Sequence, residues 1–258
     1  MRLYVWDKWK LIRYCFVLVL ISMAFTVAGK ITNDVVSTVA STTRKIPIYC
    51  VETDEPKISL TFDCAWGAKD MPQILDTLKN NNVKATFFVL GEWADKFPEI
   101  IKRMADEGHD IANHSDTHPH IASLSYDSII NEIKNANEKI ENVTGKENDL
   151  FRAPYGEYND NVISAAEELG FYTIQWDVDS LDWKNLGKEN ILNRVTSKVK
   201  NGSIILMHNG TKDTATVLPE VIKELKDKGY EFKPVSELIY KDNYAVDHTG
   251  CQKNKSVM

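Results

Sequence analysis

From Lys57 onward the chain alternates short apolar runs with longer amphipathic stretches, and this alternation limits the fold more than any other feature. Short apolar runs predict strands, and apolar residues every three or four positions predict helices. The predicted strands lie at 58–62, 84–90, 110–113, 149–152, 171–176, 203–207 and 231–232, and the predicted helices at 71–80, 98–107, 125–143, 159–169, 188–200, 216–228 and 235–240. Strands that alternate with helices form a parallel sheet with right-handed crossovers. About seven such units predict an α/β fold with a closed or nearly closed (β/α) barrel, and 258 residues suit one such domain.

Boundary residues support several of these helices. Pro98 suits the first turn of a helix that Gly108 ends. Ser125 is a favourable N-cap for the long helix at 125–143, and Gly145 is a favourable stop.

Polar side chains end or follow five of the predicted strands. The five segments are Thr61-Phe62-Asp63, His114-Ser115-Asp116-Thr117-His118, Arg152-Ala153-Pro154-Tyr155-Gly156, Asp179-Ser180-Leu181-Asp182-Trp183 and Leu206-Met207-His208. In parallel barrels the chemistry gathers at the carboxyl ends of the strands. We therefore expect these segments to converge at one edge of the barrel, as in a metal-assisted hydrolase.

His114 and His118 are candidate metal ligands. Two imidazoles four residues apart can reach one side of a turn or helix and bind a single ion, although such a pair can also be structural. The ion could be Zn²⁺, Co²⁺ or another divalent metal, because two imidazoles do not select one. Its expected work is to polarise a carbonyl and to lower the pKa of a bound water towards about 7.

Asp63 is a candidate general base that takes a proton from the attacking water. The alternatives are a helix cap or a partner for a buried base. Arg152 could orient this carboxylate through a bidentate contact. Pro154 fixes its own φ, so the backbone N–H of Tyr155 could face a developing oxyanion.

His208 is a candidate acid that protonates a departing amine, and Asp182 could orient its ring and keep it charged. Leu206 and Trp183 are expected to form an apolar wall for a small acyl group. The alternative for Trp183 is core packing. Of the remaining histidines, we interpret His109 as structural and His120 as a residue at the rim of the site.

These residues together resemble the polysaccharide deacetylase (NodB-like) family of carbohydrate esterases, over about residues 46–240. The resemblance implies a distorted (β/α) barrel and metal-dependent removal of acetyl groups from N-acetylated sugars, with zinc as the favoured ion. It implies that the catalytic base is Asp63, that the metal ligands are His114 and His118, and that the catalytic acid is His208. The same resemblance assigns base orientation to Arg152, oxyanion binding to Tyr155, tuning of the acid to the motif Asp182-Trp183 and the acyl pocket to Leu206.

The first motif departs from the family pattern. The family has Thr-Phe-Asp-Asp-Gly, whose second aspartate binds metal, whereas this chain has Thr61-Phe62-Asp63-Cys64-Ala65-Trp66-Gly67. Cys64 is either a thiolate ligand for zinc or a small buried thiol without that role, and Asp70 is a nearby carboxylate that could substitute. The variant resembles the sporulation-associated branch of the family in endospore-forming bacteria, which is thought to act on peptidoglycan.

The N-terminal 1–29 segment is predicted to be an export signal or membrane anchor. Lys8, Lys10 and Arg13 precede an uncharged apolar run at 14–29, which fits a retained anchor near 11–29 or a cleaved signal. In either case the rest of the chain is exported. The other predicted parts are a linker at 30–45, the barrel domain at 46–241 and a loose C-terminal tail at 242–258.

Charge and cysteine content limit the partners. The net charge is −6, from 31 basic and 37 acidic residues, which argues against a general nucleic-acid binder. The expected partners are an N-acetylated polysaccharide and, through the N-terminal segment, the membrane; a monomer is expected. The four cysteines show no disulfide framework, although Cys50 could pair with Cys64 in an exported protein.

Three functions are consistent with these observations. The first is hydrolytic deacetylation of N-acetylglucosamine or N-acetylmuramic acid units in peptidoglycan. The second is a catalytically silent glycan-binding or scaffold protein with the same fold, which the change at Cys64 suggests. The third is an esterase that removes O-acetyl groups with the same residues.

Overall fold

The computed structural model describes residues 9, 12–13, 15–19, 21–23 and 44–256. The described residues between 9 and 23 are helical, and the described residues from 45 to 256 form a compact unit. Within the described part of the chain, no helix combines the length and the apolar character that a membrane crossing needs. Much of the predicted signal or anchor, and almost all of the 30–45 linker, lie outside the described residues, so those interpretations stay predictions.

The compact unit is built on one parallel sheet. Its strands follow the order β6-β5-β4-β3-β2-β8-β7, and β9 pairs with the first residues of β2. The bounds are β2 Lys57–Cys64, β3 Thr86–Val89, β4 Asp110–Asn113, β5 Leu150–Phe151, β6 Tyr172–Thr173, β7 Val178–Asp179, β8 Ile204–His208 and β9 Glu231–Phe232. The parallel α/β sheet predicted from the alternation is therefore confirmed, with β7 as a strand that the sequence pattern did not predict.

The sheet curls into a half-barrel rather than closing on itself. The edge strands β6 and β7 do not pair with each other, yet only residues 174–177 separate them in the chain. That connection is too short for a helix and spans at most about 18 Å, so the two edges must lie near one another. Residues 46–51, which end in β1 (Cys50–Val51), cross this opening. Ile48 bridges to Ile174 beside β6, and Cys50 bridges to Ser203 beside β8. The predicted closed or nearly closed barrel is thus a half-barrel of parallel strands, and residues 46–51 cover its gap.

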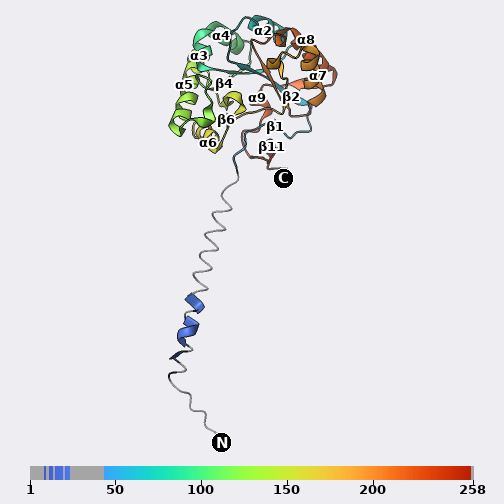
Figure 1. Cartoon of the computed structure of the whole chain (residues 1–258). Helices are drawn as coiled ribbons and strands as arrows, with labels where there is room; N and C mark the ends of the chain where they lie inside the picture. Colours follow the sequence, from blue (N-terminus) through green and yellow to red (C-terminus); the bar gives the residue numbers. More distant parts are fainter. Residues whose placement is uncertain (1–8, 10–11, 14, 20, 24–43, 257–258) are drawn as a thin grey trace. The chain divides into compact units, whose positions relative to one another are not determined.

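Helices lie around the outside of these strands (Figure 1). They are α2 Met71–Asn80, α3 Gly91–Lys96, α4 Pro98–Asp106, α5 Tyr126–Thr144, α6 Asp160–Glu168, α7 Lys188–Lys198, α8 Thr214–Asp227 and α9 Val235–Leu238. The predicted boundaries of α5 are confirmed: the Ser125 hydroxyl accepts the Ser128 N–H, and Gly145 ends the helix with φ 64°. The short helix α3 was not predicted, because one and a half turns give too little periodicity to recognise.

Successive side chains of β2 point alternately into the apolar core and towards the candidate site. Ile58, Leu60, Phe62 and Cys64 belong to the apolar core between sheet and helices. Ser59, Thr61 and Asp63 point to the opposite face, because successive strand side chains alternate. A second apolar cluster, which includes Ile48, Phe88 and Ile174, fills the inside of the half-barrel. The polar residues of that inner face are therefore held between two packed layers.

The prediction of a loose tail after residue 242 is wrong. Strands β10 (Tyr244–Val246) and β11 (Cys251–Asn254) form a hairpin, and β11 pairs with β1 in a small second sheet. A local turn supports the hairpin, since Asp247 Oδ1 accepts the N–H groups of Thr249 and Cys251. The partner strand lies about 200 residues earlier in the chain, so no local pattern could have revealed the pairing.

Candidate active site

Asp63 and Arg152 form a buried ion pair at the carboxyl end of β2. Arg152 is fully buried, and its Nη1 donates to Asp63 Oδ1 at 2.6 Å and to Thr61 Oγ1 at 2.9 Å. Its Nη2 donates to the Gln175 carbonyl at 3.0 Å, and its guanidinium lies 3.9 Å from the centre of the Phe88 ring. Burial by itself would raise the pKa of Asp63, but the Arg152 charge, with those of His114 and His208, outweighs it and lowers the pKa. The carboxylate is therefore held ionised.

His114 follows β4 and points its free ring nitrogen at this carboxylate. Its Nδ1 lies 2.8 Å from the Arg152 carbonyl oxygen, which can only accept, so Nδ1 carries the proton. Nε2 is left as the lone-pair nitrogen, 3.6 Å from Asp63 Oδ2. Burial lowers the pKa of His114, so the ring is neutral at pH 7.

His118 lies beside His114 on a tight turn rather than on a helix. Ser115 and His118 have φ of 73° and 60°, and the His118 N–H donates to Ser115 Oγ at 3.1 Å. The two imidazole centroids are 5.1 Å apart. Burial, followed by the charge of His114, lowers the pKa of His118 to about 4. Both rings are thus neutral at pH 7, as metal ligands must be.

The remaining donors do not complete the metal site that the resemblance implies. Zinc hydrolases use three protein ligands, whereas the described residues contain no group of three His, Cys, Asp or Glu side chains that could hold an ion. Cys64 is fully buried on the core face of β2, the face opposite to Asp63, and burial raises its thiol pKa well above the usual value. Asp70, whose Oδ2 accepts the Gly210 N–H at 2.8 Å, does not form such a group with the two imidazoles among the described residues. Of the two alternatives for Cys64, the structure agrees with the small buried thiol, because strand alternation directs the thiol away from the imidazoles.

Cys64→Ala is expected to leave the affinity for Zn²⁺ unchanged, because the thiol lies in the apolar core. His118→Ala is the matched control and is expected to lose most of that affinity, since one of the two imidazoles is removed. Isothermal titration of the full-length chain with Zn²⁺ measures both effects. A loss of affinity in Cys64→Ala comparable to that in His118→Ala would mean that the thiolate binds the ion.

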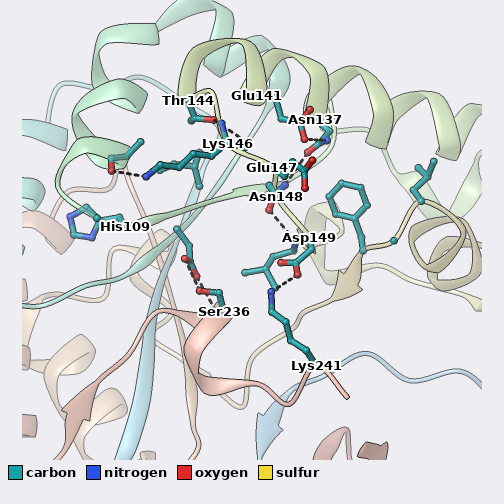
Figure 2. A pocket seen from close by; sticks show the side chains of 18 residues that line it. His109, Asn137, Glu141, Thr144, Lys146, Glu147, Asn148, Asp149, Ser236 and Lys241 are labelled. Carbon is teal, nitrogen blue, oxygen red and sulfur yellow. Dashed lines mark hydrogen bonds and ion pairs between the residues drawn. The ribbon is translucent and has the colours of Figure 1, made fainter. Parts of the chain in front are cut away.

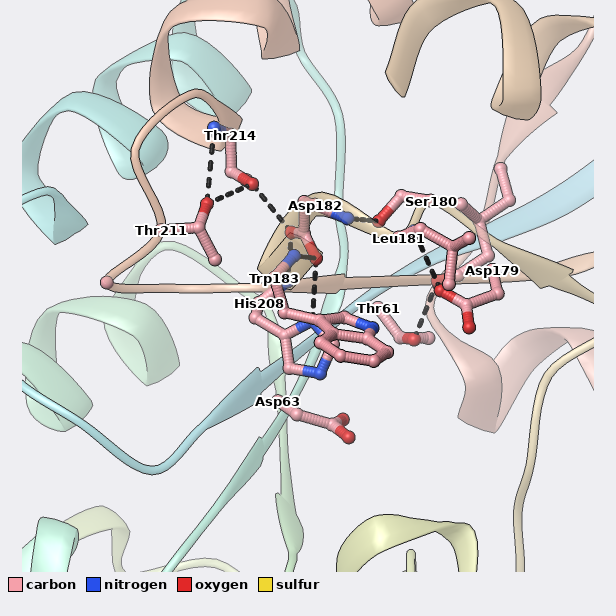
Figure 3. A network of polar contacts seen from close by, with 12 residues as sticks. Thr61, Asp63, Asp179, Ser180, Leu181, Asp182, Trp183, His208, Thr211 and Thr214 are labelled. Carbon is pink, nitrogen blue, oxygen red and sulfur yellow. Dashed lines mark hydrogen bonds and ion pairs between the residues drawn. The ribbon is translucent and has the colours of Figure 1, made fainter. Parts of the chain in front are cut away.

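His208 and Asp182 form a second charged pair, at the end of β8 (Figure 3). His208 Nδ1 lies 2.8 Å from Asp182 Oδ1, and the His208 backbone N–H donates to Oδ2 at 2.7 Å. The fully buried Asp182 also accepts the Thr214 hydroxyl at 2.6 Å and the Trp183 N–H at 2.8 Å. Burial lowers the pKa of His208, but the hydrogen bond to Asp182 and its charge outweigh this and raise the pKa. Asp182 therefore keeps the ring oriented and favours the imidazolium.

Two aromatic residues of the predicted site are exposed. Tyr155 is 56% exposed with φ 57°, and its ring stacks on His120 at 4.5 Å and meets His118 edge-on at 4.4 Å. Trp183 is 52% exposed, so the alternative of core packing is wrong for it. Leu206, in contrast, is buried on the strand that carries His208.

Several residues of the site were not predicted from the sequence. Thr61 accepts from Arg152, Thr214 donates to Asp182, and the exposed Trp66 ring lies 5.6 Å from the His118 ring. Thr61 and Trp66 flank Asp63 and Cys64 in the chain, so their proximity to the site was available as a signal. Thr214 lies 32 residues from its partner and offered none.

A separate polar pocket lies at the other end of the strands (Figure 2). It has a volume of about 760 Å³ and borders the amino ends of β4 and β5. Its polar groups are largely engaged with one another, as in the Lys241–Asp149 ion pair and the Asn148–Asn137 hydrogen bond. His109 Nδ1 accepts the Ala85 N–H at 3.1 Å, which agrees with a structural role for that histidine. The pocket contains none of the residues of the candidate site.

Comparison with known proteins identifies the family. A sequence model described as polysaccharide deacetylase matches residues 51–174. Peptidoglycan-N-acetylmuramic acid deacetylase PdaA of Bacillus subtilis is 37% identical over 196 residues, which cover 74% of this chain and 74% of PdaA. A peptidoglycan-N-acetylglucosamine deacetylase of Bacillus cereus is 40% identical over 183 residues, covering 69% of this chain and 66% of that protein.

Comparison with solved structures indicates the same family. The structure of B. subtilis PdaA, a family 4 carbohydrate esterase, matches with a TM-score of 0.70 at 36% identity and covers 74% of this chain and 84% of that one. A family 4 pseudoenzyme from Bacillus anthracis matches with a TM-score of 0.72 at 36% identity, covering 74% and 68%. A mutant of that pseudoenzyme is described as having restored enzymatic activity. The chain therefore belongs to the polysaccharide deacetylase family, a hydrolase family classed as family 4 of the carbohydrate esterases.

Proposed function

We propose that this protein hydrolyses the acetamide of N-acetylglucosamine or N-acetylmuramic acid units in peptidoglycan. One observation carries the proposal. Asp63 and His208 are direct partners on the neighbouring strands β2 and β8, so an ionised carboxylate and an imidazole with a raised pKa face the same space. Such a pair, with environments that favour opposite proton roles, suits acid–base hydrolysis. The substrates are those named for the B. subtilis and B. cereus relatives.

The proposed reaction begins with water attacking the acetamide carbonyl. Asp63 accepts a proton from that water, and Arg152 keeps the carboxylate ionised and oriented beforehand. The backbone N–H of Tyr155 is proposed to stabilise the negative charge on the carbonyl oxygen. His208 then gives its Nε2 proton to the departing nitrogen as the carbon–nitrogen bond breaks, which yields acetate and a free amine. Leu206 and Trp183 are proposed to border the acetyl methyl group.

A metal ion in this site would be held by two imidazoles. His114 and His118 are the residues that would hold a divalent cation, with zinc favoured, and such an ion polarises a carbonyl and lowers the pKa of a bound water. The described residues supply no third His, Cys, Asp or Glu ligand beside these two nitrogens, so every step above is assigned to the chain's own groups.

The proposed substrate also implies a location. Peptidoglycan lies outside the cytoplasmic membrane, which agrees with an export signal or anchor in the positively flanked apolar segment at 1–29. We propose an extracytoplasmic protein that acts during sporulation, on the basis of the Asp63-Cys64-Ala65-Trp66-Gly67 motif.

A second function is favoured by one observation. Cys64 replaces the family's metal-binding aspartate, and a pseudoenzyme from B. anthracis has a similar fold. Loss of catalysis would leave a glycan-binding protein in which the exposed rings of Trp66, Tyr155 and Trp183 stack on sugars. Removal of O-acetyl groups is a third candidate, because the same base and acid suit an ester.

Acetate release from N-acetylated and O-acetylated peptidoglycan fragments separates these functions. The full-length chain is expected to release acetate from the N-acetyl substrate, with a rate that falls at high pH. The direction of this pH dependence follows from His208, whose pKa is raised from its usual value of 6.5. The protonated acid form is lost as the pH rises through this raised pKa, and the rate falls with it. Binding of fragments without acetate release would favour the silent protein, and release only from the O-acetyl substrate would favour an esterase.

Asp182→Asn is expected to move this alkaline limit to a lower pH. The variant loses the hydrogen bond and the charge that oppose the effect of burial most strongly, so the pKa of His208 falls and its proton is lost at a lower pH. Asp177→Asn is the matched control, because Asp177 bonds Ser203 and Ile204 rather than the histidine. The position of the limit, rather than the absolute rate, is the readout. An unmoved limit in a folded Asp182→Asn protein would exclude His208 as the acid that this carboxylate tunes.

A further inference from the structure

Cys50 and Cys251 are direct partners on two neighbouring parallel strands. The register of β1 and β11 pairs Cys50 with Cys251 and Val51 with Gln252. Adjacent strands lie about 4.8 Å apart, and disulfides join Cα atoms that are about 4.4–6.8 Å apart. Directly paired residues also point their side chains to the same face of the sheet. The backbone therefore presents these two thiols at the separation that a disulfide requires.

The environment of the thiols agrees with this register. Burial is the main reason why the pKa of Cys50 rises to about 12, and the adjacent thiol of Cys251 raises it further. Cys50 is 4% exposed, whereas Cys251 is only partly buried and can be reached from solvent. The two sulfurs thus lie together, with Cys251 as the accessible member.

Pairing of Cys50 with Cys64 is excluded by the fold. Cys50 bridges to Ser203 at the amino end of the barrel strands, where Ser59 pairs with Ile204. Cys64 lies five residues beyond Ser59 on the same strand, which is about 16 Å further along. That separation exceeds the reach of a disulfide without movement of the backbone.

The strand that carries Cys50 continues the segment covering the gap of the half-barrel. The Ile48 N–H donates to the Thr173 carbonyl at 2.9 Å, and the Gln175 N–H donates to the Ile48 carbonyl at 2.7 Å. The carbonyl of Gln175 in turn accepts from Arg152. A covalent bond between β1 and β11 would therefore anchor the segment that supports the base-orienting arginine.

We propose that Cys50 and Cys251 form a disulfide that cross-links the C-terminal hairpin to the segment covering the barrel gap. The oxidant is a small-molecule or protein disulfide, R–S–S–R, in the compartment to which the protein is exported. Cys251 as thiolate attacks it and releases one R–SH, and Cys50 then attacks the Cys251 sulfur and releases a second. The two cysteines lose two electrons and two protons, which reduce R–S–S–R to two R–SH. In the cell the bond depends on the export proposed above, but the pairing itself does not.

Oxidation of the purified full-length chain tests the pairing directly. After reduction and treatment with oxidised glutathione, non-reducing peptide mapping is expected to show a peptide pair joined through Cys50 and Cys251, with Cys15 and Cys64 still alkylatable after unfolding. Cys251→Ser is expected to lack the linked pair, and Cys64→Ser, the matched control, is expected to keep it. A chain with four free thiols, or with a different linked pair, would overturn the proposal.

Thermal unfolding gives a second readout. The loop closed by the bond is long, so reduction is expected to lower the Tm of the oxidised wild type by on the order of 10 °C. Reduction is expected to leave the Tm of Cys251→Ser unchanged, and an equal response in this variant would count against the bond. Acetate release is measured separately: a linked pair without release would contradict only the proposed function, and release by a chain with four free thiols would contradict only the disulfide.

Discussion

Asp63→Asn is expected to lower acetate release by about 10²–10⁴-fold, the contribution typical of a general acid or base. Asparagine preserves the shape of the side chain and can still accept from Arg152, but it cannot take a proton from water. The effect should appear in kcat, because the lost proton transfer belongs to the transition state rather than to substrate binding. Initial rates of acetate release from an N-acetylated peptidoglycan fragment measure it.

Asp110→Asn provides the matched control. Asp110 is a partly buried carboxylate at the amino end of β4, where it accepts from Thr86 and Ser236, far along the strand from the site. Its replacement is expected to leave the rate essentially unchanged. Far-UV circular dichroism verifies that both variants fold. Wild-type turnover by folded Asp63→Asn would show that this carboxylate is not the base.

Arg152→Met is expected to destabilise the folded protein by about 3–5 kcal/mol. Removal of one member of a buried ion pair leaves the other charge without compensation, and that cost is larger than the loss of the contact itself. Arg152 is fully buried and contacts Asp63 at 2.6 Å, so the remaining carboxylate would be buried without its ion-pair partner. Urea denaturation measures the change, and the Tm is expected to fall by about 10 °C.

Two comparisons make this prediction specific. Arg103→Met removes an arginine with a similar ion-pair distance, 2.6 Å to Asp76, but one whose side chain is 33% exposed; a loss of at most about 1 kcal/mol is expected. The double variant Asp63→Asn with Arg152→Met is expected to be less destabilised than the sum of the two single variants, because neither buried charge is left alone. A cost for Arg152→Met no larger than that for Arg103→Met would mean that the buried pair has no special energetic role.

The strand–helix alternation was readable from the chain because each unit is local. Ser125 and Gly145 bound α5 through contacts within a few residues, and the apolar stripe between them needs no distant partner. Asp63, His114, Arg152 and His208 end or follow strands, and parallel strands bring their carboxyl ends to one edge. The convergence of these residues therefore followed from the topology.

Other features depended on which residues meet across the fold. The hairpin of β10 and β11 pairs with β1, a strand about 200 residues earlier in the chain, so its segment looked like a loose tail. Thr214 contributes a hydrogen bond to Asp182 that no spacing rule predicts. The exposed position of Trp183 was equally undecided, because an aromatic residue after a strand can be buried or can face solvent.

The chain by itself determined the parallel α/β architecture and the chemistry carried to its strand ends, since periodicity and residue type are local properties. The tertiary structure alone decided that Cys64 faces the apolar core, that the barrel gap is covered by residues 46–51, and that Cys50 meets Cys251. These outcomes depend on strand facing and register, which packing between distant segments sets once the whole sheet has formed.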